Sequence, residues 1–62
     1  MIDRRKLEEL VWDLTVGSGE GELSTTEIVG LVEDRLGQRL DAVQARIVQR
    51  KNDECRMAME HP

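Results

Sequence analysis

Residues 23–51 read LSTTEIVGLVEDRLGQRLDAVQARIVQRK, and this stretch decides the fold of the chain. It begins with Ser24 and Glu27 in the S-x-x-E pattern of a capping box, in which each side chain accepts a hydrogen bond from the other residue's backbone N–H. The apolar residues that follow recur on one face of a helix, namely Ile28, Val29, Val32 and Leu36. The pattern predicts a helix over residues 24–36, closed by Gly37 in the left-handed conformation typical of a helix end.

A second helix follows almost at once and is predicted over residues 41–58. Asp41 is its expected N-cap, and Gln44 three residues later completes a second capping box. At about 100° per residue, the apolar residues fall toward one side of this helix, namely Val43, Ile47 and Val48. The other side carries small and polar residues, namely Ala42, Ala45, Arg46, Gln49 and Arg50. Such a side suits a nucleic-acid groove, because Arg bonds guanine and Gln bonds adenine at their major-groove edges.

The two helices resemble the helix-turn-helix core of DNA-binding regulators of the winged-helix type. The match lies in STTEIVGLVEDRLG (24–37) as the supporting helix and LDAVQARIVQRK (40–51) as the recognition helix. No strand pattern follows Lys51, so the wing of that family is expected to be absent. The resemblance implies transcription regulation, with the third helix in the major groove of duplex DNA. It matches Gln44, Arg46, Gln49 and Arg50 to the exposed positions of a recognition helix. The DNA-binding hypothesis places Arg46, Gln49 and Arg50 toward the groove, and Arg39 and Lys51 toward phosphate.

A helix over residues 3–16 is predicted to precede this pair and to pack against it. Its buried stripe is formed by Leu7, Leu10, Val11 and Leu14. Trp12 lies off the centre of that stripe, where it is either a partly exposed aromatic at the core edge or a binding anchor. Arg4, Arg5 and Lys6 crowd the start of the helix, where the helix dipole disfavours positive charge. They are either a solvated turn or a contact for phosphate or an acidic partner.

The glycine-rich stretch GSGEGE, residues 17–22, predicts a flexible loop between the first two helices. It lacks the endings that define phosphate-binding loops and the ligand spacing of calcium loops. Gly30 lies inside a helix, where it costs about 1 kcal/mol relative to Ala. It marks either a close approach by another helix or a tolerated weak point.

Residues 52–60 extend the third helix, with Cys55 and Met59 continuing the side that carries Val48. This extension is expected to project beyond a small three-helix body. There it either pairs with a second copy of the chain or frays, because its charged residues leave little continuous apolar surface.

The composition allows one all-α domain over residues 1–62 with a thin aliphatic core. The chain has 62 residues, one Trp and neither Phe nor Tyr. Because such short chains are marginally stable alone, a homodimer is expected. The single cysteine excludes an intramolecular disulfide. No apolar run approaches the roughly 18 residues needed to cross a membrane, and no signal-peptide pattern opens the sequence. We therefore expect a cytoplasmic protein without cofactor or metal.

The net charge of −4 is unevenly distributed along the chain. Residues 1–34 carry a net charge of −6 and residues 52–62 carry −2, whereas residues 35–51 carry +4. A basic segment within an acidic protein still binds phosphate locally, although the surrounding carboxylates weaken its attraction for a polyanion.

Catalysis is not expected, because the predicted helices contain no histidine and Cys55 has no neighbouring base. Two functions remain. The first is a small DNA-binding transcription regulator that uses its third helix as the recognition helix. The second is an acidic helical module that binds another protein, as an adaptor, inhibitor or small subunit. The absence of Phe and Tyr makes single-strand binding by base stacking the weaker alternative to duplex binding.

Overall fold

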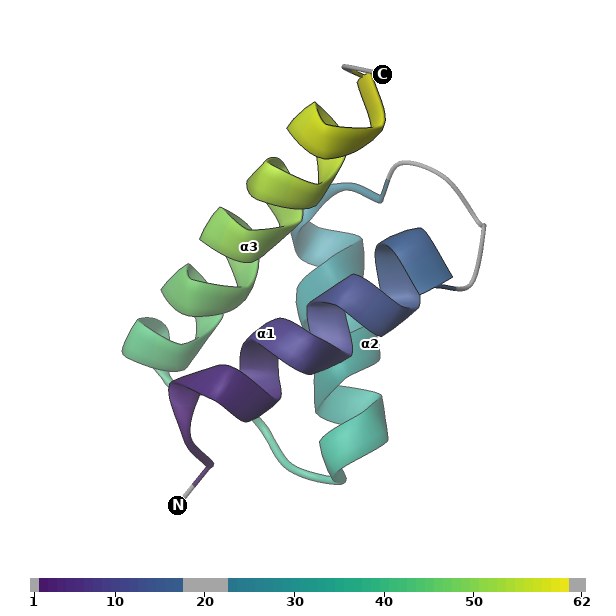
Figure 1. Cartoon of the computed structure of the whole chain (residues 1–62). Helices are drawn as coiled ribbons and strands as arrows, with labels where there is room; N and C mark the ends of the chain where they lie inside the picture. The colour runs from purple at the N-terminus through teal and green to yellow at the C-terminus, as the bar shows by residue number, and fades with distance from the viewer. Residues whose placement is uncertain (1, 18–22, 61–62) are drawn as a thin grey trace.

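The computed structural model describes residues 2–17 and 23–60, and for residues 59 and 60 the backbone alone. Three α-helices and one π-helical turn make up this part of the chain (Figure 1). They are α1 (Arg4–Trp12), η1 (Asp13–Gly17), α2 (Thr25–Leu36) and α3 (Ala42–Glu60). No strand occurs within these ranges, and the predicted all-α three-helix fold is confirmed.

Each α-helix begins at the cap that its sequence predicts. Ser24 Oγ accepts a hydrogen bond from the Glu27 N–H at 3.2 Å, while Glu27 Oε1 accepts from the Ser24 N–H at 3.3 Å. Asp41 and Gln44 form the same reciprocal pair before α3, at 2.8 and 3.0 Å. Asp3 caps α1 by accepting from the Lys6 N–H at 2.9 Å. These bonds satisfy backbone donors that a helix start otherwise leaves without partners.

Glu33 fixes the turn between α2 and α3. Its carbonyl oxygen accepts hydrogen bonds from the backbone N–H groups of Gly37, at 2.8 Å, and Gln38, at 3.3 Å. Its carboxylate accepts a third bond from the Leu40 N–H at 2.9 Å. Gly37 has a φ of 71°, the left-handed conformation predicted for it. The direction in which α3 leaves α2 is therefore set by one side chain and one glycine.

The core lies where α3 crosses the other two helices. Its buried apolar members are Leu7, Val11, Leu14, Leu23, Ile28, Val32, Val48 and Cys55. The closest association is between α1 and α3, followed by that between α2 and α3. In Figure 1, α3 runs along one side of the molecule while α1 passes in front of α2.

The expectation that the end of α3 projects beyond the body is wrong for the segment that contains Asn52 and Cys55. Both side chains are fully buried. Asn52 Nδ2 donates a hydrogen bond at 2.9 Å to the carbonyl oxygen of Leu23, the residue that leads into α2. This part of α3 therefore closes the core within a single chain. The side chain of Met59 lies outside the described residues.

The first predicted helix differs in its last turn. The α-helix ends at Trp12, and η1 continues it with π-helical geometry to Gly17. Thr15 is buried in this turn, and its Oγ1 donates to the carbonyl oxygen of Val11 at 2.7 Å. The remainder of the predicted glycine-rich loop, residues 18–22, lies outside the described residues.

Candidate nucleic-acid interface

The solvent-exposed side of α3 lies opposite its buried side. The buried side comprises Val48, Asn52 and Cys55. At about 100° per residue, the opposite side carries five residues that we call the outer face of α3: Val43, Arg46, Arg50, Asp53 and Met57. All five are exposed. The prediction that Val43 lies on the apolar side is wrong, because it is 70% exposed and about 140° around the helix from Val48.

The beginning of α1 lies against the first half of α3 and brings a third arginine to Arg46 and Arg50. Together they line a pocket of about 130 Å³. Its lining residues are Arg4, Glu8, Val43, Arg46, Ile47 and Arg50, and we call it the arginine pocket. Arg4 and Glu8 form an ion pair across one helical turn, with Nε and Oε2 separated by 3.7 Å. The pocket is therefore lined by three arginines and one glutamate.

Positive charge on the outer face is confined to the first three turns of α3. Arg46 and Arg50 lie in these turns, whereas Asp53 and Glu54 follow immediately and are exposed. A polyanion is therefore attracted to the N-terminal half of α3 and repelled beyond Arg50. Recognition helices of helix-turn-helix proteins likewise contact base edges with their N-terminal residues.

The other polar residues predicted at the interface lie around this basic region. Gln49 is exposed, and by helical geometry it lies about 60° from Arg46 on the side away from Arg50. Arg39 is exposed in the turn that precedes α3. Gln44 is half-buried, and its Oε1 is engaged by the Asp41 N–H in the capping box. Gln44 therefore has a structural role at the start of α3.

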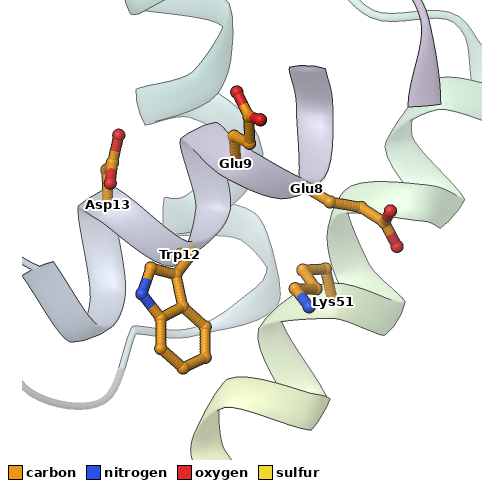
Figure 2. A pocket seen from close by; sticks show the side chains of 5 residues that line it. All are labelled: Glu8, Glu9, Trp12, Asp13 and Lys51. Atoms are coloured by element: carbon orange, nitrogen blue, oxygen red, sulfur yellow. The ribbon is translucent and has the colours of Figure 1, made fainter. Parts of the chain in front are cut away.

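Lys51 lies in a second pocket, away from Arg46. Figure 2 shows its side chain and that of Trp12 extending into the same opening from α3 and α1. The ammonium nitrogen is 5.7 Å from the centre of the Trp12 ring and 3.4 Å from Glu54 Oε2. This pocket has a volume of about 430 Å³ and is lined by Glu8, Glu9, Trp12, Asp13 and Lys51. Lys51 is thus held between the Trp12 indole ring and the Glu54 carboxylate, and the predicted site divides into two parts.

Trp12 is 44% exposed, as its position off the apolar stripe predicts. Its ring contacts a lysine of the same chain, which gives it a role at the edge of the α1–α3 contact. A cation above an indole face is attracted by the ring quadrupole.

In the described part of the chain, no group of three or more His, Cys, Asp or Glu residues is arranged to hold a metal ion. The Cys55 thiol is free and fully buried. None of the described helices is both long and apolar enough to cross a membrane.

Two members of the arginine pocket escaped the sequence-based assignment. One feature of the sequence indicated a role for Arg4: the basic run at residues 4–6 lies at the helix start, where the helix dipole disfavours positive charge. No feature of the sequence indicated a role for Glu8, because its position beside Arg46 and Arg50 depends on how α1 crosses α3. Comparison with protein-family models, curated proteins and solved structures found no match for this chain.

Proposed function

We propose that this protein is a small helix-turn-helix regulator that binds duplex DNA through the first three turns of α3. The observation that carries the proposal is the concentration of Arg4, Arg46 and Arg50 at one exposed site of an acidic protein. A local basic surface of this kind attracts phosphate even when the net charge is negative. Duplex binding would also require an intracellular location, in agreement with the cytoplasmic localisation expected from the sequence.

Base recognition is assigned to Arg46 on the outer face of α3 and to Gln49 beside it. Arg46 and Gln49 carry the side chains that pair with guanine and adenine in the major groove. Val43 supports the same assignment, because an exposed apolar side chain in the first turn of α3 suits contact with a thymine methyl group. Arg50 lies between Arg46 and Val43 around the helix and lines the pocket shared with α1. Arg39 lies in the turn before the helix. Contact with the phosphate backbone is expected for both.

The affinity should be modest and strongly dependent on salt. The basic region presents few arginines, and Asp53 and Glu54 adjoin it on α3. Each phosphate that is neutralised contributes about −0.9 to the slope of log K against log salt concentration. Three or four contacts would therefore give a slope of about −3 to −4.

Replacing Arg46 tests whether α3 reads bases. Arg46→Gln should cost roughly 1–3 kcal/mol on the preferred duplex and much less on mixed duplex DNA. Arg35→Gln is the matched control, because Arg35 is also exposed but belongs to the last turn of α2. Equal losses for the two variants on the preferred duplex would mean that charge alone, without base recognition, explains the binding.

A second function is favoured by the apolar residues on the same face. Val43 and Met57 are 70% and 60% exposed, and they flank the two arginines along α3. Protein interfaces combine exposed apolar groups with arginine in this manner. An acidic protein surface would then be the partner, and its binding would be lost in Arg46→Glu, Arg50→Glu and Met57→Asp. DNA binding predicts little effect of Met57→Asp relative to Arg46→Glu, because Met57 lies beyond the basic turns.

The homodimer expected from the thin core remains part of the proposal. It is supported by the small number of buried apolar residues and by the exposure of Trp12, Val43 and Met57. Helix-turn-helix regulators commonly bind two half-sites as dimers. Since Asn52 and Cys55 are buried within one chain, that side of the end of α3 is not available to the interface, whereas Met57 on the opposite side is exposed.

A further inference from the structure

We infer that the arginine pocket binds one phosphate group and that Glu8 acts as its internal counter-ion when no phosphate is present. The assignment of this phosphate to a DNA backbone rests on the proposed function. The inference adds α1 to the interface, through Arg4 and Glu8, and it concerns residues outside the recognition helix.

Positive charge exceeds negative charge in the lining of the pocket. Arg4, Arg46 and Arg50 contribute three positive charges and Glu8 contributes one negative charge. Among the described residues, Arg4 pairs only with Glu8, and the side chains of Arg46 and Arg50 have no ion pair or hydrogen bond. An anion that enters the pocket therefore meets guanidinium groups whose donors are available. Guanidinium groups bind phosphate oxygens through paired, charge-assisted hydrogen bonds.

The Arg4–Glu8 contact is too long for a hydrogen bond. Its N–O distance of 3.7 Å is an ion pair but exceeds the usual range of a hydrogen bond. Glu8 thus reduces the positive potential without occupying the Arg4 donor, and the pair is easily replaced. A phosphate group that accepts a hydrogen bond from Arg4 would displace this weaker interaction.

The pocket is small, and part of its lining is apolar. Its volume of about 130 Å³ is well below the roughly 300 Å³ at which sites for larger organic ligands begin. Val43 and Ile47 supply apolar walls beside the charged groups. These properties match a single tetrahedral anion.

The pocket also lies where a DNA strand would pass. By helical geometry, Arg50 lies about 40° nearer than Arg46 to Val43 and the α1 side of α3. If Arg46 and Gln49 face the base edges, Arg4 and Arg50 stand at the border of the same surface. A phosphate held by Arg4 and Arg50 would fix the position of α3 relative to the backbone.

Adjacent residues supply matched controls for the test. Arg4→Gln and Arg5→Gln remove the same charge from consecutive exposed positions, but only Arg4 lines the pocket. Glu8→Gln and Glu9→Gln remove the same negative charge from α1, and only Glu8 lines the pocket. Circular dichroism would verify that each variant remains helical.

The first measurement is a titration of the intact chain with inorganic phosphate and pyrophosphate, followed through the arginine Nε–H resonances in NMR spectra. The resonances of Arg4, Arg46 and Arg50 should shift together, and Glu8→Gln should bind several-fold more tightly than Glu9→Gln. Uniform shifts of all arginines, or equal effects of the two glutamate variants, would overturn the phosphate pocket.

The second measurement is binding to mixed duplex DNA over a range of salt concentrations. Arg4→Gln should weaken binding about tenfold and reduce the salt slope by about one, and Arg5→Gln should do neither. Equal losses for Arg4→Gln and Arg5→Gln would contradict a specific role for the pocket. If phosphate shifts only the resonances of Arg4, Arg46 and Arg50 and no duplex binds, the pocket is upheld and the proposed DNA-binding function is overturned. A failure of the pocket and a failure of the proposed function are therefore distinguishable.

Discussion

Asn52 on α3 and Leu23 before α2 are joined by a buried hydrogen bond of 2.9 Å across 29 positions of the sequence. The bond connects the second half of α3 to the start of α2. Asn52 Oδ1 has no hydrogen-bond partner among the described residues, although the side chain is fully buried. Asn52 thus combines one satisfied and one unsatisfied polar group within an apolar core.

Asn52→Ala should lower the free energy of unfolding by about 2–3 kcal/mol. It removes the bond to the Leu23 carbonyl, leaves that oxygen without a partner and opens a cavity. Thermal or urea unfolding followed by circular dichroism measures the loss. Gln49→Ala is the control, because Gln49 is exposed on the same helix and should change stability by less than about 0.5 kcal/mol. Equal stabilities of the two variants would contradict the buried position of Asn52.

Replacing Gly30 or Gly37 with alanine should change the free energy of unfolding in opposite directions. A Cβ at Gly30 would meet no atom within 4 Å, so Gly30→Ala should stabilise the protein by about 1 kcal/mol. This open space also rules out the close helix approach considered for Gly30. Gly37 has a φ of 71°, so Gly37→Ala should destabilise by about 1 kcal/mol. Unfolding midpoints that shift in the same direction would show that the α2 boundary is misplaced.

Glu33 should stabilise the turn between α2 and α3 through its side chain as well as its backbone. Glu33→Ala removes the acceptor of the Leu40 N–H and should cost about 1–2 kcal/mol. Glu33→Gln keeps an acceptor oxygen and should cost less. Asp34→Ala serves as the control at the neighbouring exposed position. If Glu33→Ala and Asp34→Ala unfold at the same urea concentration, the carboxylate does not hold the turn.

The oligomeric state can be measured directly by light scattering at micromolar concentration. A homodimer of the 7.1 kDa chain is expected to scatter as twice that mass. Trp12→Ser and Met57→Ser should shift the equilibrium toward monomer if their exposed surfaces contribute to the interface. A stable monomer at every concentration tested would remove the dimer from the proposal and leave the monomeric fold unchanged.

The parts of this structure that could be predicted from the sequence depend on nearby residues. The pairs Ser24–Glu27 and Asp41–Gln44 are three residues apart, and both form as their spacing predicts. The left-handed Gly37 is likewise a local feature. A capping box or a glycine end depends on a few consecutive side chains, which a sequence pattern contains in full.

Features that depend on packing between distant elements were missed. The exposure of Val43 and the burial of Asn52 follow from the angle at which α3 crosses the other helices. The Arg4–Glu8 pair reaches Arg46 and Arg50 only through the contact between α1 and α3. The π-helical turn at η1 was also missed, because the apolar spacing around Leu14 fits an ordinary α-helix equally well.

Binding of the wild-type chain to a mixed-sequence DNA duplex tests the central claim most directly. Fluorescence anisotropy should be measured at about 50 mM salt, where electrostatic attraction is strong, and then at increasing salt concentrations. The proposed interface predicts saturable binding with a salt slope of about −3 to −4, lost in the Arg46→Glu, Arg50→Glu double variant. No binding of the wild-type chain at about 50 mM salt would contradict the DNA-binding function.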